Sequence, residues 1–137
     1  MRAISVLVAG AALASCSTAP YQAPTRTAAK QAEFQQLIGG KVAQRPISCL
    51  PHYYSNDMRV IDDNTVVFRE GSYRVYVAHL NGGCTGLGSG GYTLVTRQFG
   101  TADLCNGQIA TVVDPVSHVT VGSCSFGDFQ PFVRPGA

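Results

Sequence analysis

The chain has 137 residues and a formal net charge of +2, and only 13% of its residues are charged, against 45% that are hydrophobic. This length suits one small domain. The chain lacks the clustered lysines and arginines, interleaved with aromatic residues, that nucleic-acid binding needs, so we expect no nucleic-acid partner.

The first fifteen residues have the order of a secretory signal. Arg2 supplies a positive start, residues 3–13 are apolar, and Ala14 and Ser15 are small. The apolar stretch is roughly half of the ~20 residues that a membrane-spanning helix needs. Residues 1–15 therefore predict a cleaved signal peptide.

The run Leu13-Ala14-Ser15-Cys16 resembles the lipobox of bacterial lipoproteins, whose cysteine accepts acyl chains such as palmitate. The resemblance implies a lipid-modified N-terminus at Cys16, held firmly because each buried methylene contributes about 0.8 kcal/mol. Ser17 stands where an aspartate would imply retention in the inner membrane. We therefore expect the outer membrane, facing the periplasm, with the inner membrane as the alternative. The other interpretation is an ordinary secretory signal with a chance cysteine.

We expect residues 16–45 to be a lipid-anchored tether that contains one short helix over 27–38. Thr27 can cap this helix, and an apolar stripe at helical spacing runs from Phe34 to Ile38. We expect this stripe to pack on the domain rather than in lipid.

Residues 46–134 change to strand patterns and predict a disulfide-stabilised, all-β domain, a small antiparallel meander or barrel of about six strands. The expected strands cover residues 58–61, 65–69, 73–80, 92–97, 108–113 and 118–122. Residues 81–91 contain six glycines and Cys84, so we expect a loop pinned by a disulfide, in a position where binding residues tend to lie. Three phenylalanines spaced by three are expected to close the core; they are Phe126, Phe129 and Phe132.

Four cysteines follow Cys16, namely Cys49, Cys84, Cys105 and Cys124. An even number in a short exported chain indicates two disulfides, for which three pairings are possible. We prefer Cys105 with Cys124, because a turn at Asp114-Pro115 would bring the flanking strands together. Cys49 with Cys84 then follows by elimination.

The sequence contains no convincing catalytic or metal site, and we expect no enzyme, metal or cofactor. Gly88-Ser89-Gly90 lies in a glycine loop without the strand-to-helix context of a nucleophile elbow. Cys49 and His52 have metal-ligand spacing, but a cysteine in a disulfide cannot supply a thiolate.

Two further groups of residues have competing interpretations. Asp62 and Asp63 could act as paired carboxylates or hold calcium, but neighbouring strand residues point to opposite faces, so we favour a turn. Tyrosines could line a ligand surface, although strand packing explains them equally well. They are Tyr53, Tyr54, Tyr73, Tyr76 and Tyr92.

Several short elements occur in a fixed order with the cysteines. They are Ser48-Cys49-Leu50, Arg59-Val60-Ile61-Asp62-Asp63, Val66-Val67-Phe68, Val75-Tyr76-Val77, Cys84-Thr85-Gly86-Leu87, Leu104-Cys105-Asn106-Gly107, and Cys124 with Phe126-Gly127-Asp128-Phe129. Over residues 46–133 this order resembles a family of small, uncharacterised proteobacterial envelope lipoproteins, known as a domain of unknown function. The resemblance implies an envelope location and transfers no catalytic residues.

We therefore predict a membrane-anchored, non-catalytic binding or interaction module with an envelope protein as its partner. One alternative is a periplasmic enzyme inhibitor, similar in architecture to the lipoprotein inhibitors of lysozyme. A second is a small hydrolase that uses His79 or His118 with an aspartate, and a third is a purely structural role in the envelope.

Overall fold

The computed structural model describes residues 26–51, 57–97 and 103–136. The predictions for the signal segment, Cys16, Ser17, His52, Tyr53 and Tyr54 fall outside these residues. Within the described ranges, no helix is long and apolar enough to cross a bilayer.

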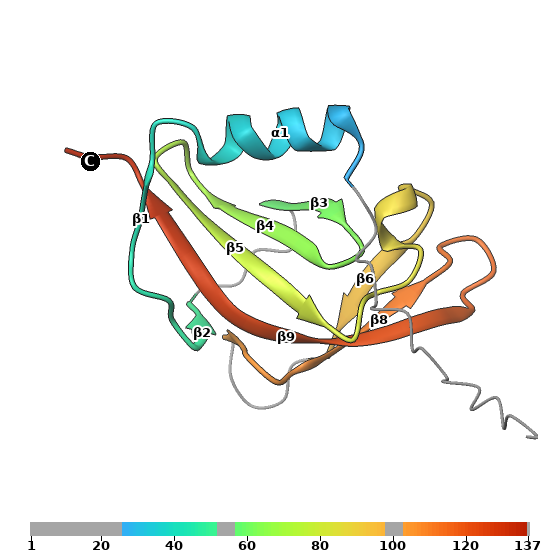
Figure 1. Cartoon of the computed structure of the whole chain (residues 1–137). Helices are drawn as coiled ribbons and strands as arrows, with labels where there is room; N and C mark the ends of the chain where they lie inside the picture. The colour runs from blue at the N-terminus through green and yellow to red at the C-terminus, as the bar shows by residue number, and fades with distance from the viewer. Residues whose placement is uncertain (1–25, 52–56, 98–102, 137) are drawn as a thin grey trace, which may run out of the picture.

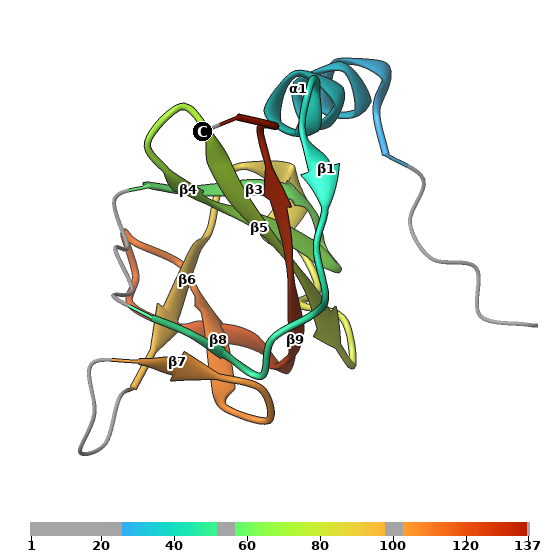
Figure 2. The same ribbon diagram turned by 90° about the vertical axis from the view of Figure 1, so that its left-hand side faces the viewer.

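The elements in chain order are α1 (Ala28–Ile38), β1 (Val42–Ala43), β2 (Cys49–Leu50), β3 (Met58–Asp62), β4 (Thr65–Glu70), β5 (Arg74–Asn81), a 3-10 helix (Leu87–Ser89), β6 (Thr93–Thr96), β7 (Leu104–Cys105), β8 (Ile109–Val113) and β9 (Thr120–Val133). The main sheet has the order β3-β4-β5-β9-β8-β6, β1 also pairs with β9, and β2 pairs with β7 in a small second sheet. All of these pairs are antiparallel. The main sheet curls, and α1 lies across the outer side of β3, β4 and β5 (Figures 1 and 2). The expected fold, a small curled antiparallel sheet with one N-terminal helix, is confirmed.

The predicted helix is confirmed almost to the residue. The Thr27 hydroxyl accepts the N–H of Lys30 at 3.2 Å and so caps α1. The stripe that begins at Phe34 packs on the outer side of the sheet, as expected. The predicted domain start at residue 46 is too late, because Arg26 and α1 belong to the folded unit and β1 pairs with the end of β9.

The longest strand, β9, organises the sheet. Its first half pairs with β8 along one edge, and its second half pairs with β5 along the other. The edge of β9 that pairs with β8 in its first half pairs with β1 and Ile47 in its second half. Because the partner changes along its length, β9 joins both halves of the curl. The strand predicted over residues 118–122 is too short, because β9 continues to Val133 through Gly127 and Pro131, two residue types that are rare inside strands.

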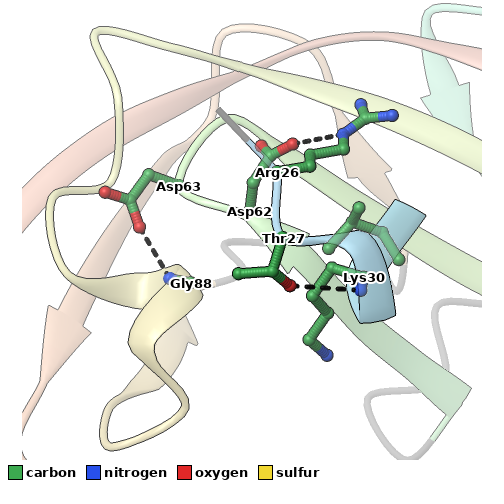
Figure 3. Close-up of a pocket in the computed structure, with 7 residues that line it drawn as sticks. Arg26, Thr27, Lys30, Asp62, Asp63 and Gly88 are labelled. Carbon is green, nitrogen blue, oxygen red and sulfur yellow. Dashed lines mark hydrogen bonds and ion pairs between the residues drawn. The ribbon is translucent and has the colours of Figure 1, made fainter. Parts of the chain in front are cut away.

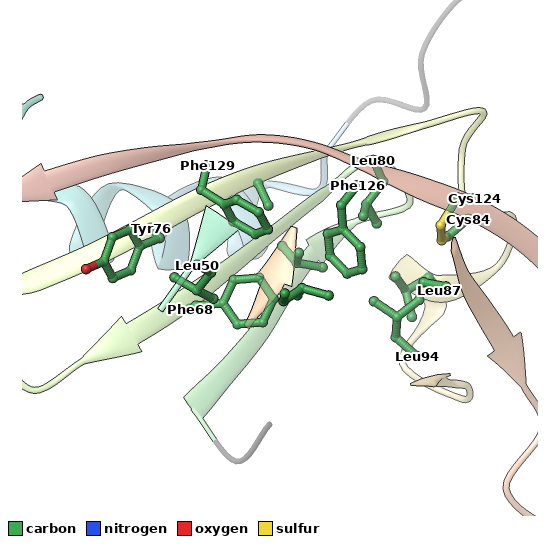
Figure 4. Close-up of a cluster of buried hydrophobic side chains, with 14 of the residues drawn as sticks. Leu50, Phe68, Tyr76, Leu80, Cys84, Leu87, Leu94, Cys124, Phe126 and Phe129 are labelled. Atoms are coloured by element: carbon green, nitrogen blue, oxygen red, sulfur yellow. A yellow bond between two sulfur atoms is a disulfide. The ribbon is translucent and has the colours of Figure 1, made fainter. Parts of the chain in front are cut away.

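Two hydrophobic clusters lie on opposite faces of the main sheet. The inner cluster fills the curl, and in it the rings of Phe126 and Phe129 lie 6.0 Å apart (Figure 4). Residues three apart on a regular strand would point to opposite faces, but a register shift opposite Ala78 and Leu80 turns both rings inward. Phe132 lies on the outer face, beneath α1. The expectation that these phenylalanines close the core is therefore confirmed: Phe126 and Phe129 belong to the inner cluster, and Phe132 packs against the outer one.

The disulfides join Cys49 to Cys105 and Cys84 to Cys124, so the predicted pairing is wrong. In the β8–β9 hairpin it is Ala110, not Cys105, that stands opposite Cys124. Cys105 lies in β7, directly across from Cys49 in β2. Cys84 follows the end of β5, which pairs with β9, and it reaches Cys124 there.

Candidate interaction surface

The adjacent carboxylates at the β3–β4 turn have different partners (Figure 3). One oxygen of Asp62 accepts the N–H of Asn64 at 2.8 Å, and the other pairs with Nε of Arg26 at 2.6 Å. Asp63 accepts the N–H of Gly88 at 2.6 Å. The turn interpretation is confirmed, and the two side chains do not converge on a shared acid/base or calcium site.

A cleft of about 110 Å³ lies between this turn, the start of α1 and the glycine loop (Figure 3). The Arg26 guanidinium donates to the hydroxyl of Thr65 at 3.1 Å and lies 4.5 Å from the centre of the Phe34 ring. Nζ of Lys30 donates to the carbonyl of Val60 at 2.9 Å. Because its charged groups are already paired, this cleft is a structural junction that fastens α1 to the sheet.

The glycine loop, residues 81–91, is held from two sides. Cys84 is buried and ties the loop to β9 through its disulfide, which confirms the predicted pinning. Leu87–Ser89 forms the 3-10 helix, and the chain continues into β6 rather than into an α-helix, so no nucleophile elbow is formed. An added Cβ at Gly88 would lie 3.0 Å from an oxygen of Asp63. Asp63 is therefore a second clamp, one that the sequence did not reveal.

The described histidines make no side-chain ion pair with a carboxylate, although the backbone N–H of His118 donates to the backbone carbonyl of Asp114 at 2.8 Å. His79 on β5 and His118 in the β8–β9 turn are exposed. The same part of the chain contains no group of three potential metal ligands. Cys49, half of the candidate metal spacing, is bonded to Cys105.

The described tyrosines occupy separate positions. Tyr76 is buried in the inner cluster and its hydroxyl donates to Glu70 at 2.8 Å; burial, followed by this bond, raises the pKa of Tyr76. Tyr92 packs against the same cluster. Tyr73 is exposed and lies 5.8 Å from the guanidinium of Arg74. These side chains do not form one ligand surface.

An exposed apolar surface lies on the outer side of β6, β8 and the first half of β9. In the same sheet, α1 covers the outer side of β3 to β5, and no helix in the described part of the chain lies over this half (Figures 1 and 2). Ile109 is 61% exposed, Val121 44% and Val95 40%. The solvent side of an antiparallel sheet is normally polar. The β6–β8–β9 face, as we name it, consists of Thr93, Val95, Ile109, Thr111, Val113, Val121 and Ser123.

The two ends of this face differ in shape and charge. At one end, a hollow of about 280 Å³ is lined by Val95, Ile109 and Thr111, together with the exposed Arg97. At the other end is the tip of the β8–β9 hairpin, where Asp114 accepts two backbone N–H bonds that lower its pKa and keep it ionised.

No protein-family model, curated protein or solved structure matches this chain. The family resemblance noted above therefore remains a proposal from the sequence.

The sequence predicts binding contacts in the glycine loop and does not reveal the β6–β8–β9 face. The strands that form this face were predicted. The alternation of apolar and polar residues along a strand, however, does not tell which side of the strand a helix covers. The available signal was the β-branched character of both sides of the β8–β9 hairpin, where a half-solvated strand would carry polar residues on one side.

Proposed function

We propose that this chain is a membrane-anchored lipoprotein of the bacterial envelope whose folded domain is a non-catalytic interaction module in the periplasm. The observation that carries the proposal is the β6–β8–β9 face, whose valines and isoleucine are exposed among the described residues, on a scaffold stabilised by two disulfides. Exposed apolar side chains gathered on one face of a small domain are typical of an interaction site.

The anchor is supported by the Leu13-Ala14-Ser15-Cys16 run. Ten peptide steps separate Cys16 from Arg26, and each step spans at most about 3.3–3.6 Å, so the domain would remain within about 35 Å of the lipid surface. Such a tether concentrates the face near other envelope components.

The non-catalytic assignment is supported by the positions of the candidate groups. His79 and His118 are exposed, and Asp62 and Asp63 are engaged in the turn and the loop clamp. An acid/base mechanism needs a pair of such groups within hydrogen-bonding reach in a pocket.

Metabolic labelling with a fatty acid tests the anchor in the full chain. Wild type should incorporate the label and fractionate with membranes, and Cys16→Ala should do neither. Ser15→Ala is the matched control, because a small residue still precedes the cysteine. Label retained in Cys16→Ala would refute the assignment of the anchor.

Crosslinking in intact cells of the native host, followed by mass spectrometry, tests the interaction module. We expect reproducible adducts from the wild-type chain that Ile109→Lys removes and Val42→Lys retains. Val42 is the matched control because it is also exposed, at 53%, on a paired strand outside the face. Adducts that are insensitive to Ile109→Lys would count against the face.

A periplasmic enzyme inhibitor is a second candidate, favoured by the held glycine loop. Inhibitors gain affinity from loops that are rigid before binding, and Asp63 and the Cys84 disulfide both restrain this one. A lysozyme turbidity assay tests this candidate. Inhibition that Asp63→Ala weakens would support it, and full lysozyme activity in a molar excess of the protein would exclude lysozyme as the target.

A further inference from the structure

Within the described residues, another element covers one half of the outer side of the main sheet, and the β6–β8–β9 face is the other half. Helix α1 packs over the β3–β5 half through Phe34, Leu37 and Ile38. On the other half, the outward positions are apolar or carry hydroxyls, and Ile109 is the most exposed of them at 61%.

Opposite charges flank this neutral face. Arg97 follows β6 at one end, and Asp114 follows β8 at the other. The ladder runs from Thr93 opposite Val113 to Thr96 opposite Ala110, so the two charges stand at opposite ends of about 10 Å of paired strand. They do not pair within one chain.

The two ends of the face also differ in shape. The hollow of about 280 Å³ lies at the Arg97 end, between Val95 and Ile109. Exposed valines project at the Asp114 end, with Val119 57% and Val121 44% exposed.

A two-fold axis lying in the face and running across the strands exchanges its ends. It sets the Arg97 end of one copy against the Asp114 end of the other, brings the end with the exposed valines over the end with the hollow, and does so twice by symmetry. We propose that a second copy of this chain docks face to face on the β6–β8–β9 face in this arrangement. The partner in the proposed interaction module is then the chain itself.

This inference deepens the proposed function by naming its partner, and the two can fail separately. Adducts of the chain with other envelope proteins in the native host, without any product at twice the chain mass, would overturn self-association and leave the interaction module standing.

The first test is the mass of the purified full chain by light scattering over a concentration series. Wild type should form a dimer, and Ile109→Lys should raise the dissociation constant at least about tenfold, because a hydrated ammonium group replaces the most exposed apolar side chain of the face. Val42→Lys, which adds the same charge at an exposed site on β1, should behave as wild type. A monomeric wild type, or equal effects of the two substitutions, overturns the proposal.

The second test exchanges the charges between copies. Arg97→Glu alone and Asp114→Lys alone should each dissociate the dimer, because every end then meets a like charge. An equimolar mixture should associate again, because a heterodimer of the two variants restores both opposite-charge contacts. Mapping of both disulfides in each variant verifies that it is folded. A mixture no better associated than either variant alone overturns the arrangement.

Discussion

Removing the two disulfides one at a time should have unequal effects on the stability of the domain. Cys49–Cys105 and Cys84–Cys124 join residues 56 and 40 positions apart, and loop closure gives each bridge a similar contribution of about 4 kcal/mol. Their surroundings differ, since Cys84 and Cys124 are buried in the inner cluster whereas Cys49 is exposed.

Serine replacements make this difference measurable. Cys84→Ser with Cys124→Ser places two hydroxyls in an apolar core, at about 1–3 kcal/mol for each group left unpaired. We therefore expect this double variant to lose about 2–6 kcal/mol more free energy of unfolding than Cys49→Ser with Cys105→Ser.

Urea unfolding followed by far-UV circular dichroism checks this prediction. The full chain carrying Cys16→Ala, which removes the proposed lipid, is a convenient background for both double variants. Equal losses, or a larger loss from the β2–β7 bridge, would refute the burial argument. In the parent of the two variants, partial reduction and alkylation should open Cys49–Cys105 first.

Three further outcomes are expected. Asp63→Asn, which keeps the shape of the loop clamp but removes its charge, should lower the free energy of unfolding by about 1–2 kcal/mol in urea; an unchanged midpoint would mean that the clamp adds nothing. Backbone N–H bonds lower the pKa of Asp114 in the folded chain. Its stabilisation of the hairpin tip should therefore be complete above the ordinary value of about 3.9 and disappear as pH falls from there through the lowered pKa. An NMR titration of this carboxyl carbon checks that prediction, and a midpoint at the ordinary value contradicts it. Ser17→Asp should move the lipoprotein from outer-membrane to inner-membrane fractions, and an unchanged distribution would speak against the predicted sorting.

The elements with a local pattern could be predicted from the sequence. Thr27 marks the start of α1, and the turn composition between β3 and β4 indicates their hairpin, because capping and turn preferences act over a few residues. The two-residue strands β1, β2 and β7 carry no periodicity, so their pairing could not be foreseen. The disulfide error follows from this, since Cys49 and Cys105 meet only through β2 and β7.

The candidate surface was harder to predict than the fold. In the clamp, Asp63 accepts hydrogen bonds from Gly86 and Gly88, which lie 23 and 25 positions further along the chain. The sequence offered only a local role for this aspartate, as a turn residue. Which half of the outer sheet side stays uncovered depends on where α1 docks, and that is a tertiary contact. The β6–β8–β9 face therefore became visible only once the order of the strands was known.

Site-specific photocrosslinking in intact cells tests the central claim most directly, that the β6–β8–β9 face is the interaction surface of an anchored module. A photoreactive amino acid replaces Ile109 in one full-length chain and Val42 in another, so that both probes stand on exposed, paired strands. We predict a discrete adduct from position 109, at twice the chain mass, and none from position 42. Equal adducts from the two positions, or none from position 109, would contradict the account.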